Sequence, residues 1–247
     1  MVKNAKKFSH VSNFTGYMEI VARYFAGQPK GLCILDLPAG NGLMADALRG
    51  LGHEVECGDI NCERPEYRYI DMALPLPFAD DEFDAAICLE GVEHLVNPVQ
   101  LIAEISRIVR SGGTIVITTP NVLNFYSRLQ FLFTGTLHQY NPAAVPRFTR
   151  GENADRGHVF PLSYFQLRYL FEQNNVCVKH VLGDRFKRKI LLPVYLLLLP
   201  FCLLWSWRMF MYDSDHSQPG RNRELFNHAF STPILFSRSL ILILEKT

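Results

Sequence analysis

The feature that most constrains this chain is a short apolar run that ends in a carboxylate and continues into a glycine-rich turn. Residues 34–42 read Ile-Leu-Asp-Leu-Pro-Ala-Gly-Asn-Gly. A helical pattern over residues 43–51 and a second strand pattern over residues 54–59 follow directly. This order predicts a strand-helix-strand unit with two parallel strands, which is the building block of α/β folds.

Strand and helix patterns continue along most of the chain. Further strands are expected to end at residue 71 and to cover residues 83–89, 114–118, 176–181 and 239–244. Helices are expected over residues 13–25, 98–110 and 161–173, with glycines at 112–113 ending the second of these. The alternation predicts an α/β, Rossmann-like fold with a doubly wound, mostly parallel sheet of seven strands. The 247 residues suit a single domain over residues 1–247.

Charge and cysteine usage limit the partners and the compartment. The 25 basic and 24 acidic side chains leave a net charge of +1, which provides no general attraction for a nucleic-acid backbone, so no nucleic-acid partner is expected. The six cysteines are scattered without a C-x-x-C pair, as is typical of a reducing interior. The basic N-terminus is not followed by the apolar core of a secretory signal. We therefore expect a cytoplasmic protein.

Two cofactor classes fit the glycine turn taken alone. Gly40-x-Gly42-x-x-Ala45 satisfies the dinucleotide pattern, and Asp59 is placed to accept hydrogen bonds from a ribose diol. An NAD-dependent oxidoreductase is therefore one interpretation. Asp36 favours the other interpretation, because a carboxylate at the strand end would repel a pyrophosphate but attract the cationic amino-acid end of S-adenosylmethionine.

Two further segments carry a resemblance to a known family. Residues 71–84 read Asp-Met-Ala-Leu-Pro-Leu-Pro-Phe-Ala-Asp-Asp-Glu-Phe-Asp, and residues 86–95 read Ala-Ile-Cys-Leu-Glu-Gly-Val-Glu-His-Leu. Together with the glycine turn, they make residues 32–181 and the final strand closely similar to the class I S-adenosylmethionine-dependent methyltransferases. The combined motifs are much more specific than any one of them.

The resemblance implies which residues hold S-adenosylmethionine. The methionine end would lie against Asp36, Ala39, Gly40 and Gly42, the ribose against Asp59 and Ile60, the adenine against Asp71 and Met72, and the open side against Leu89. Ordinary turn capping by the two aspartates at the strand ends is the alternative. The chain departs from the family at Pro38, where glycine is usual. Because proline fixes φ and lacks an N–H group, we expect a tighter turn with one backbone contact fewer.

A group of ionisable residues follows the strand at residues 83–89. Glu90, Glu93 and His94 are spaced to share one face of a helical turn, and His158 could join them as a fourth metal ligand. This set resembles the polyprenyl-catechol O-methyltransferases of ubiquinone synthesis and the small-RNA 2′-O-methyltransferases, which implies a divalent metal, such as Mg²⁺, that acidifies the acceptor's oxygen. Without a metal, His94 would line the acceptor site or act as its base. Glu93 and His94 are the candidate catalytic residues.

Two segments interrupt the regular pattern. Residues 121–157 are aromatic and lack clean periodicity, so we expect a loop-like insertion that covers the active site. Residues 185–232 separate the last two strands and include an uncharged apolar run at 190–207, preceded by basic residues and ending in aromatic ones. We expect an apolar helical insertion there, followed by a solvated loop over residues 213–223.

Residues 190–207 also raise the question of membrane contact. Flanking basic and aromatic residues are typical of a membrane interface, whereas Pro193, Pro200 and the short length disfavour a simple span. A monotopic, interfacial or re-entrant helical element with peripheral membrane contact is the leading hypothesis, and a true span and a buried lid or dimer-forming helix pair remain open. Interfacial contact would bring the protein to the cytoplasmic face of a membrane.

The sequence therefore predicts a S-adenosylmethionine-dependent methyltransferase that methylates an oxygen of a small or lipid-linked acceptor. One alternative is an NAD-dependent oxidoreductase on the same fold. The other is a non-catalytic, membrane-associated protein that binds the cofactor without turnover.

Overall fold

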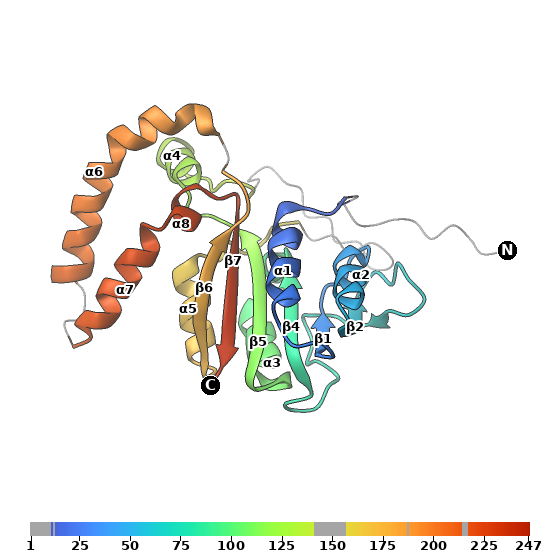
Figure 1. Ribbon diagram of the computed structural model, residues 1–247. Coiled ribbons are helices and arrows are strands. Elements are labelled where there is room, and N and C mark those ends of the chain that lie inside the picture. Colours follow the sequence, from blue (N-terminus) through green and yellow to red (C-terminus); the bar gives the residue numbers. More distant parts are fainter. Residues whose placement is uncertain (1–10, 12, 141–156, 187, 214–216) are drawn as a thin grey trace.

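Seven strands form one sheet at the centre of the molecule (Figure 1). The computed structural model describes residues 11, 13–140, 157–186, 188–213 and 217–247. The strands are β1 (Cys33–Asp36), β2 (Glu54–Asp59), β3 (Arg68–Tyr69), β4 (Phe83–Leu89), β5 (Val109–Pro120), β6 (Val176–Gly183) and β7 (Ser239–Lys246). Their order is β3-β2-β1-β4-β5-β7-β6, and β7 alone among these strands runs antiparallel to its neighbours. The predicted Rossmann-like, mostly parallel sheet is confirmed.

The strand order changes direction between β1 and β4. Chain connections lead from β1 outward to β2 and β3, and from β4 outward to β5. The two central strands are parallel and pair in register, with Asp36 opposite Ile87. In an open α/β sheet, ligands bind beyond the carboxyl ends of the strands at such a switch point. The glycine turn after β1 and the acidic segment after β4 therefore share one edge of the sheet.

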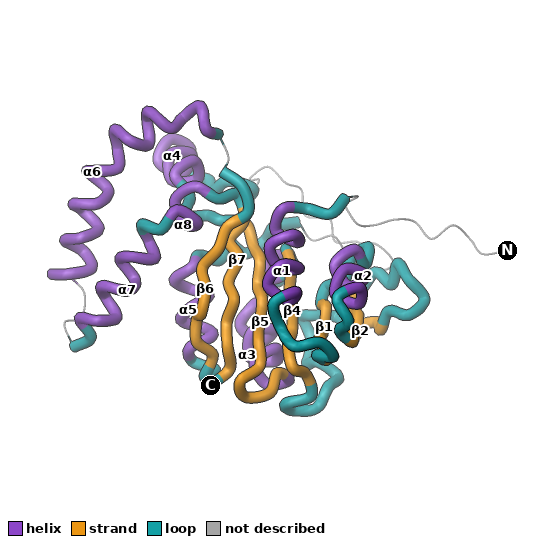
Figure 2. The backbone as a smooth tube through the Cα atoms, in the orientation of Figure 1, coloured by secondary structure: helices purple, strands orange, loops and turns teal. Residues whose placement is uncertain are grey.

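Helices cover both faces of the sheet (Figure 2). α1 (Gly16–Ala26) and α2 (Leu43–Gly50) cover one face, where Phe25 and Leu48 are buried with side chains of the central strands. α3 (Pro98–Ile108) and α5 (Tyr164–Glu172) cover the other face through buried side chains that include Ile105 and Phe171. A short 3-10 helix, η1 (Val92–His94), follows β4. The result is a three-layer α/β/α domain.

The end of α3 differs from the prediction. The helix stops at Ile108, and β5 begins at the next residue, so the glycines at 112 and 113 lie inside a strand rather than ending a helix. A Cβ on Gly113 would lie 2.7 Å from the backbone oxygen of Asp84. Glycine is therefore required by the close approach of two backbones at an irregularity between β4 and β5.

The segment after β5 is not simply a loop. Residues 125–134 form the helix α4 (Phe125–Thr134), so the predicted loop character is wrong for this part. The Asn124 side chain caps the helix by accepting a hydrogen bond from the backbone N–H of Ser127 at 2.9 Å. The expected cover over residues 121–157 extends further, and its residues 141–156 lie outside the described part of the chain.

The long segment between β6 and β7 is helical. η2 (Lys189–Leu191), α6 (Leu192–Arg208) and the π-helix η3 (Met209–Asp213) follow one another, and α7 (Pro219–Ala229) and α8 (Thr232–Phe236) lead back to β7. Figure 1 shows α6 as an arch that stands away from the sheet, with α7 returning beside it. The predicted apolar helix is present, but the predicted solvated loop over residues 213–223 is wrong, because α7 begins at Pro219.

α7 is fixed to the domain by ion pairs that sequence reasoning did not anticipate. The guanidinium of Arg168 in α5 lies 3.0 Å from the Glu224 carboxylate of α7, and Arg221 of α7 pairs with Glu172 of α5. Arg168 is buried, so this pair is shielded from solvent on one side. Tyr164 and His228 add a hydrogen bond between the same two helices.

Candidate active site

The turn after β1 is fastened by the acidic residue at the end of β2. Gly40 and Gly42 adopt φ angles of 53° and 80°, a conformation that favours glycine. The buried Asp59 carboxylate accepts hydrogen bonds from the backbone N–H groups of Gly40 at 2.9 Å and Asn61 at 2.8 Å. Each oxygen can accept a second bond. Asp59 therefore caps this turn and still has acceptor capacity for a ligand hydroxyl.

Asp36 is a buried carboxyl group with an unsatisfied oxygen. The residue is 1% exposed, and its Oδ2 atom has no hydrogen-bond partner among the described residues. Burial raises the pKa of Asp36 to about 8, the charge of Asp59 adds to the rise, and Arg49 opposes it. A cationic ligand group would satisfy the oxygen and favour the carboxylate. The ammonium group of S-adenosylmethionine has this charge, so the site fits the cofactor.

Pro38 joins the glycine turn to the segment after β4. The Leu37–Pro38 peptide bond is cis. A Cβ placed on Gly91 would lie 2.5 Å from Pro38 Cδ and 3.1 Å from Cys88 Sγ. The proline ring thus occupies the space that a side chain at position 91 would need. Pro38 therefore fits because residue 91 is glycine. The two motifs are in direct contact.

The other cofactor candidates lie along the same edge. The backbone N–H of the residue before Asp71 donates to the Asp59 carbonyl at 3.2 Å, which brings the two segments side by side. The Asp71 carboxylate caps its own turn by accepting from the backbone N–H two residues later at 2.9 Å, and Met72 packs against the core. Ile60 is partly exposed, and Leu89 is buried at the end of β4. Ala39 is buried in the glycine turn.

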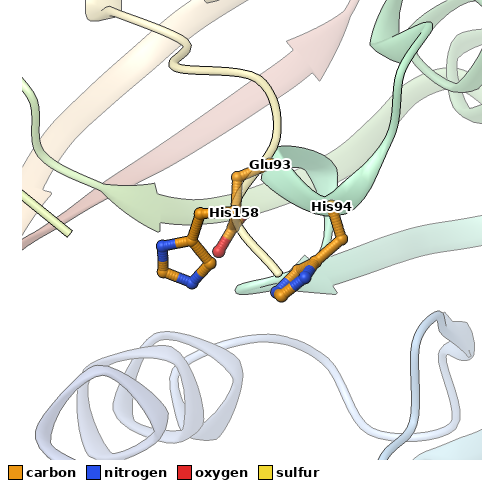
Figure 3. A group of neighbouring side chains, drawn as sticks. All are labelled: Glu93, His94 and His158. Carbon is orange, nitrogen blue, oxygen red and sulfur yellow. The ribbon is translucent and has the colours of Figure 1, made fainter. Parts of the chain in front are cut away.

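Glu93, His94 and His158 come together from distant parts of the sequence (Figure 3). One ligand atom from each residue can be chosen so that all three lie within 4.8 Å of one another. The backbone N–H groups of Val159 and Phe160 both donate to the Glu93 carbonyl, at 2.9 and 3.0 Å. These bonds hold the His158 segment against η1. The ring centroids of the two histidines are 5.0 Å apart.

The Glu93 carboxyl is fully buried. Burial raises the pKa of Glu93 well above its ordinary range, and the charge of Glu90 raises it further. One carboxyl oxygen accepts a hydrogen bond from Thr119 Oγ1 at 3.2 Å, and the other has no partner among the described residues. Such a group either takes up a proton readily or requires a cation beside it. Both properties suit chemistry at an acceptor hydroxyl.

Glu90 is not in this group of three residues, so its place in the tentative four-residue metal set stays a prediction. It follows β4 with a positive φ of 50°, and its backbone N–H donates to the carbonyl and the hydroxyl of Thr118 at 3.0 and 2.9 Å. Burial raises the pKa of the Glu90 carboxyl, and the nearby charge of Arg238 lowers it. Glu90 therefore lies in a tight turn after β4, from which its charge still raises the pKa of Glu93.

Two tyrosines near the cluster were missed by sequence reasoning. Burial raises the pKa of Tyr17 in α1 and of Tyr140, and the charges of Glu90 and Glu93 add to both shifts. The Tyr140 ring centroid lies 5.5 Å from that of His158. Tyr17 belongs to the apolar face of the N-terminal helix, and this placement could have marked it. Tyr140 lies in the aperiodic segment, where no pattern marks any residue.

Comparisons with known proteins found a family model, sequence relatives and similar solved structures. A family model described as a methyltransferase domain matches residues 10–180. The chain is 28% identical over 162 residues to a ubiquinone biosynthesis O-methyltransferase of Dechloromonas aromatica (strain RCB), covering 54% of this chain and 69% of that relative. It is 35% identical over 105 residues to a demethylmenaquinone methyltransferase of Clavibacter sepedonicus, covering 36% and 42%.

A solved structure shows the same fold. The SAM-dependent methyltransferase from Archaeoglobus fulgidus matches with a TM-score of 0.54 and 18% identity, over 93% of this chain and 94% of that one. Neither the oxidoreductase interpretation nor the non-catalytic one gains support from these matches.

Proposed function

This chain belongs to the S-adenosylmethionine-dependent methyltransferases, and we propose that it transfers the methyl group to an oxygen of a small or lipid-linked acceptor. The observation that carries the proposal is the buried carboxyl of Glu93 beside His94 and His158, at the sheet edge where the glycine turn also lies. Methylation of a hydroxyl requires removal of its proton, and this cluster offers groups that accept one.

The cofactor would be held by the turns that follow β1, β2 and β3 and by the end of β4. When bound, S-adenosylmethionine supplies an electrophilic methyl group on a sulfonium sulfur. Asp36 would face the cationic amino-acid end and Asp59 the ribose, while the turn itself is kept open by its glycines. The residues proposed to contact the cofactor are Asp36, Ala39, Gly40, Gly42, Asp59, Ile60, Asp71, Met72 and Leu89.

Glu93 and His94 would act on the acceptor. The methyl transfer is an in-line displacement, so the enzyme must align the acceptor oxygen and exclude water. The O–H proton of the acceptor would pass to His94, which like His158 is partly exposed, with Glu93 beside it. A carboxyl with a raised pKa can share that proton without carrying an isolated buried charge.

A divalent metal is the second way in which the same cluster could act. Two imidazoles and one carboxylate suit Mn²⁺, Fe²⁺ or Zn²⁺ better than Mg²⁺, which prefers an all-oxygen set. The unpartnered oxygen of Glu93 fits a cation. Glu93, His94 and His158 would hold the metal, which would supply a Lewis acid that lowers the pKa of an acceptor hydroxyl.

The acceptor is proposed to be lipid-linked. The names of the relatives from ubiquinone and menaquinone biosynthesis favour a quinone-type small molecule. Lys189–Tyr212 is a helical run long and apolar enough to cross a membrane by length and composition. We therefore propose a cytoplasmic enzyme with peripheral membrane contact through residues 190–207.

Calorimetry tests the cofactor part of the proposal. The purified protein is titrated with S-adenosylhomocysteine and separately with NAD. We expect micromolar binding of the first and none of the second, whereas tight NAD binding alone would overturn the proposal.

Transfer of a labelled methyl group tests the acceptor part. The protein is incubated with methyl-labelled S-adenosylmethionine and membrane lipids, and the organic extract is analysed by mass spectrometry. We expect label in an ether-linked product, and His94→Gln to abolish it while S-adenosylhomocysteine still binds. The control is His180→Gln, an exposed histidine on β6. Label on a carbon atom would contradict O-methylation.

Metal content tests the remaining choice. The protein is dialysed against EDTA, reloaded with Mn²⁺ or Zn²⁺, and analysed for bound metal. The metal is supported if dialysis removes the activity, and if His158→Gln no longer binds the added metal whereas His180→Gln still does. Full activity after dialysis would instead favour direct proton transfer to His94.

A further inference from the structure

The outward face of α6 is apolar along its whole length. Leu197, Phe201 and Trp205 are 69%, 70% and 76% exposed, and they follow one another at helical spacing. Tyr195 is the one buried residue within α6, and Phe210 in the following η3 is also buried. A surface helix of a soluble domain usually reverses this pattern, with polar side chains outward. The exposed side of α6 therefore requires an apolar environment.

Both ends of this helical run contact the same domain. Near its start, the Tyr195 ring stacks on Phe125 of α4, with ring centroids 5.1 Å apart and planes inclined by 11°. Near its end, the Phe210 ring lies 5.9 Å from Phe165 of α5 and 6.2 Å from Phe226 of α7. The run is about 36 Å long at 1.5 Å per residue, enough for a bilayer. A helix tied to one domain at both ends cannot place those ends on opposite sides of a membrane.

The course of the chain after α6 also argues against a membrane span. After α6 the chain comes back through α7, which carries Arg221, Arg223 and Glu224 and forms ion pairs with α5. A second crossing by these charged residues would be costly in hydrocarbon. β7 must also rejoin the sheet between β5 and β6. The true span left open by the sequence is therefore incompatible with the fold.

The charged residues around α6 indicate what covers its apolar face. Basic residues stand at both ends of α6, namely Arg185, Arg188 and Lys189 before it and Arg208 at its end, and residues 185–212 contain no acidic side chain. The guanidinium of Arg188 lies 4.1 Å from the ring centroid of Tyr126, which places this charge where α6 meets α4. Basic side chains beside an apolar, Trp-containing surface fit anionic lipid headgroups.

We propose that α6 lies in the plane of one leaflet of an anionic bilayer, with the face that includes Leu197, Phe201, Leu204 and Trp205 inserted. α4 packs on α6 through its first turns, with Phe125 against Tyr195. Its last turn exposes Phe131, Leu132 and Phe133, and we place these side chains in the same leaflet. This proposal deepens the peripheral contact proposed above and rests on it, but it does not depend on the methyl acceptor.

The two tryptophans of the chain, Trp205 and Trp207, both lie in α6, so tryptophan fluorescence reports on this helix alone. The full chain is mixed with phosphatidylcholine vesicles that contain about 30% phosphatidylglycerol. We expect co-sedimentation and a blue-shifted emission, both much weaker with pure phosphatidylcholine. The variant Leu197→Glu/Leu204→Glu should lower partitioning at least about tenfold. Val99→Glu, an exposed apolar position on α3, is the matched control and should bind as the natural chain does.

Depth-dependent quenching then fixes the orientation. In a Trp205→Phe/Trp207→Phe background, Leu197→Trp places a single tryptophan near the middle of the run. Lipids brominated near the headgroups should quench it more strongly than lipids brominated near the chain ends. Stronger quenching from the bilayer centre would overturn the in-plane orientation.

Two outcomes would overturn lipid docking itself. One is equal sedimentation of the natural chain and Leu197→Glu/Leu204→Glu. The other is a vesicle-independent dimer that this double variant converts to a monomer. S-adenosylhomocysteine binding, measured on the same samples, reports on the proposed function separately, because none of these positions lies among the proposed cofactor contacts.

Discussion

Replacing Asp36 by asparagine should make the ligand-free protein more stable and the cofactor complex weaker. The free protein holds this carboxyl protonated below a pKa of about 8, against an ordinary value of 3.8. At 1.36 kcal/mol per pH unit, keeping the proton at pH 7 costs about 4 kcal/mol relative to the unfolded chain. The asparagine amide has no such cost, but it buries donors without an evident partner, at about 1–3 kcal/mol. A net gain of about 1–3 kcal/mol remains.

The pH dependence carries the sharper test. A carboxyl whose pKa is raised by folding contributes full stability below its unfolded pKa, and the contribution is lost as the pH rises toward the folded pKa. Between pH 5 and 7, the natural chain should therefore lose about 3 kcal/mol of unfolding free energy relative to Asp36→Asn. Urea titrations followed by circular dichroism at several pH values measure this difference. A difference that stays constant across the range would refute the reasoning.

Cofactor affinity should move in the opposite direction. A cationic ligand group favours the Asp36 carboxylate, so binding releases a proton below pH 8, and the affinity for S-adenosylhomocysteine should rise up to tenfold per pH unit between pH 6 and 8. Asp36→Asn should bind at least about tenfold more weakly and lose this slope. Calorimetry in buffers of different ionisation enthalpy counts the released proton. Unchanged affinity in the variant would show that Asp36 does not face the ligand.

Three further predictions concern the contacts around the site. Gly91→Ala should lower the unfolding free energy by about 1–3 kcal/mol, because its Cβ would meet the Pro38 ring, and thermal denaturation measures the loss. Arg168→Met removes the buried partner of Glu224, so it should lower the unfolding free energy by about 2 kcal/mol. It should also speed limited proteolysis between α6 and α7, and an unchanged cleavage rate would contradict the anchoring role of Arg168. The rate of methyl transfer should rise with pH as Glu93 loses its proton, and Glu93→Gln should flatten this pH–rate profile. Identical profiles for the natural chain and the variant would exclude Glu93 as the titrating group.

The regular parts of the fold were accessible from the sequence because each carries its own periodic signal. β2 and β4 were predicted with the same bounds as the structure has, since each is a compact run with clear breaks on both sides. α7 was missed because its residues are mostly polar and begin with Pro-Gly. Its stability comes from tertiary partners, above all the buried guanidinium of Arg168, and a local pattern does not register these contacts.

The cluster at the acceptor side shows the same division. Glu93 and His94 could be grouped because they are neighbours in the chain, and both lie in η1. Glu90 has the predicted spacing too, but it adopts a positive φ, and glutamate gives no sequence signal for this conformation. His158 was included as a candidate fourth ligand, although no local spacing links it to Glu93. The segment after His158 is held by hydrogen bonds from backbone N–H groups to the Glu93 carbonyl. Such backbone contacts leave no pattern in the sequence of side chains.

The position of the helical insertion in the sheet shows how the proposed membrane surface and the proposed methyl-transfer site would serve one acceptor. β6 runs parallel to β1 and β4, so it ends at their carboxyl edge, and the antiparallel β7 begins there, with Gly183 opposite Leu240. Any segment inserted between these two strands must leave and re-enter at that edge. α4 leaves the same edge after β5. Topology alone therefore places α4 and the ends of the α6–α8 insertion on the side of the sheet where Glu93 and the glycine turn lie. If α6 rests in a leaflet, an acceptor held by its tail in that leaflet would meet the enzyme at the catalytic edge rather than at the opposite one.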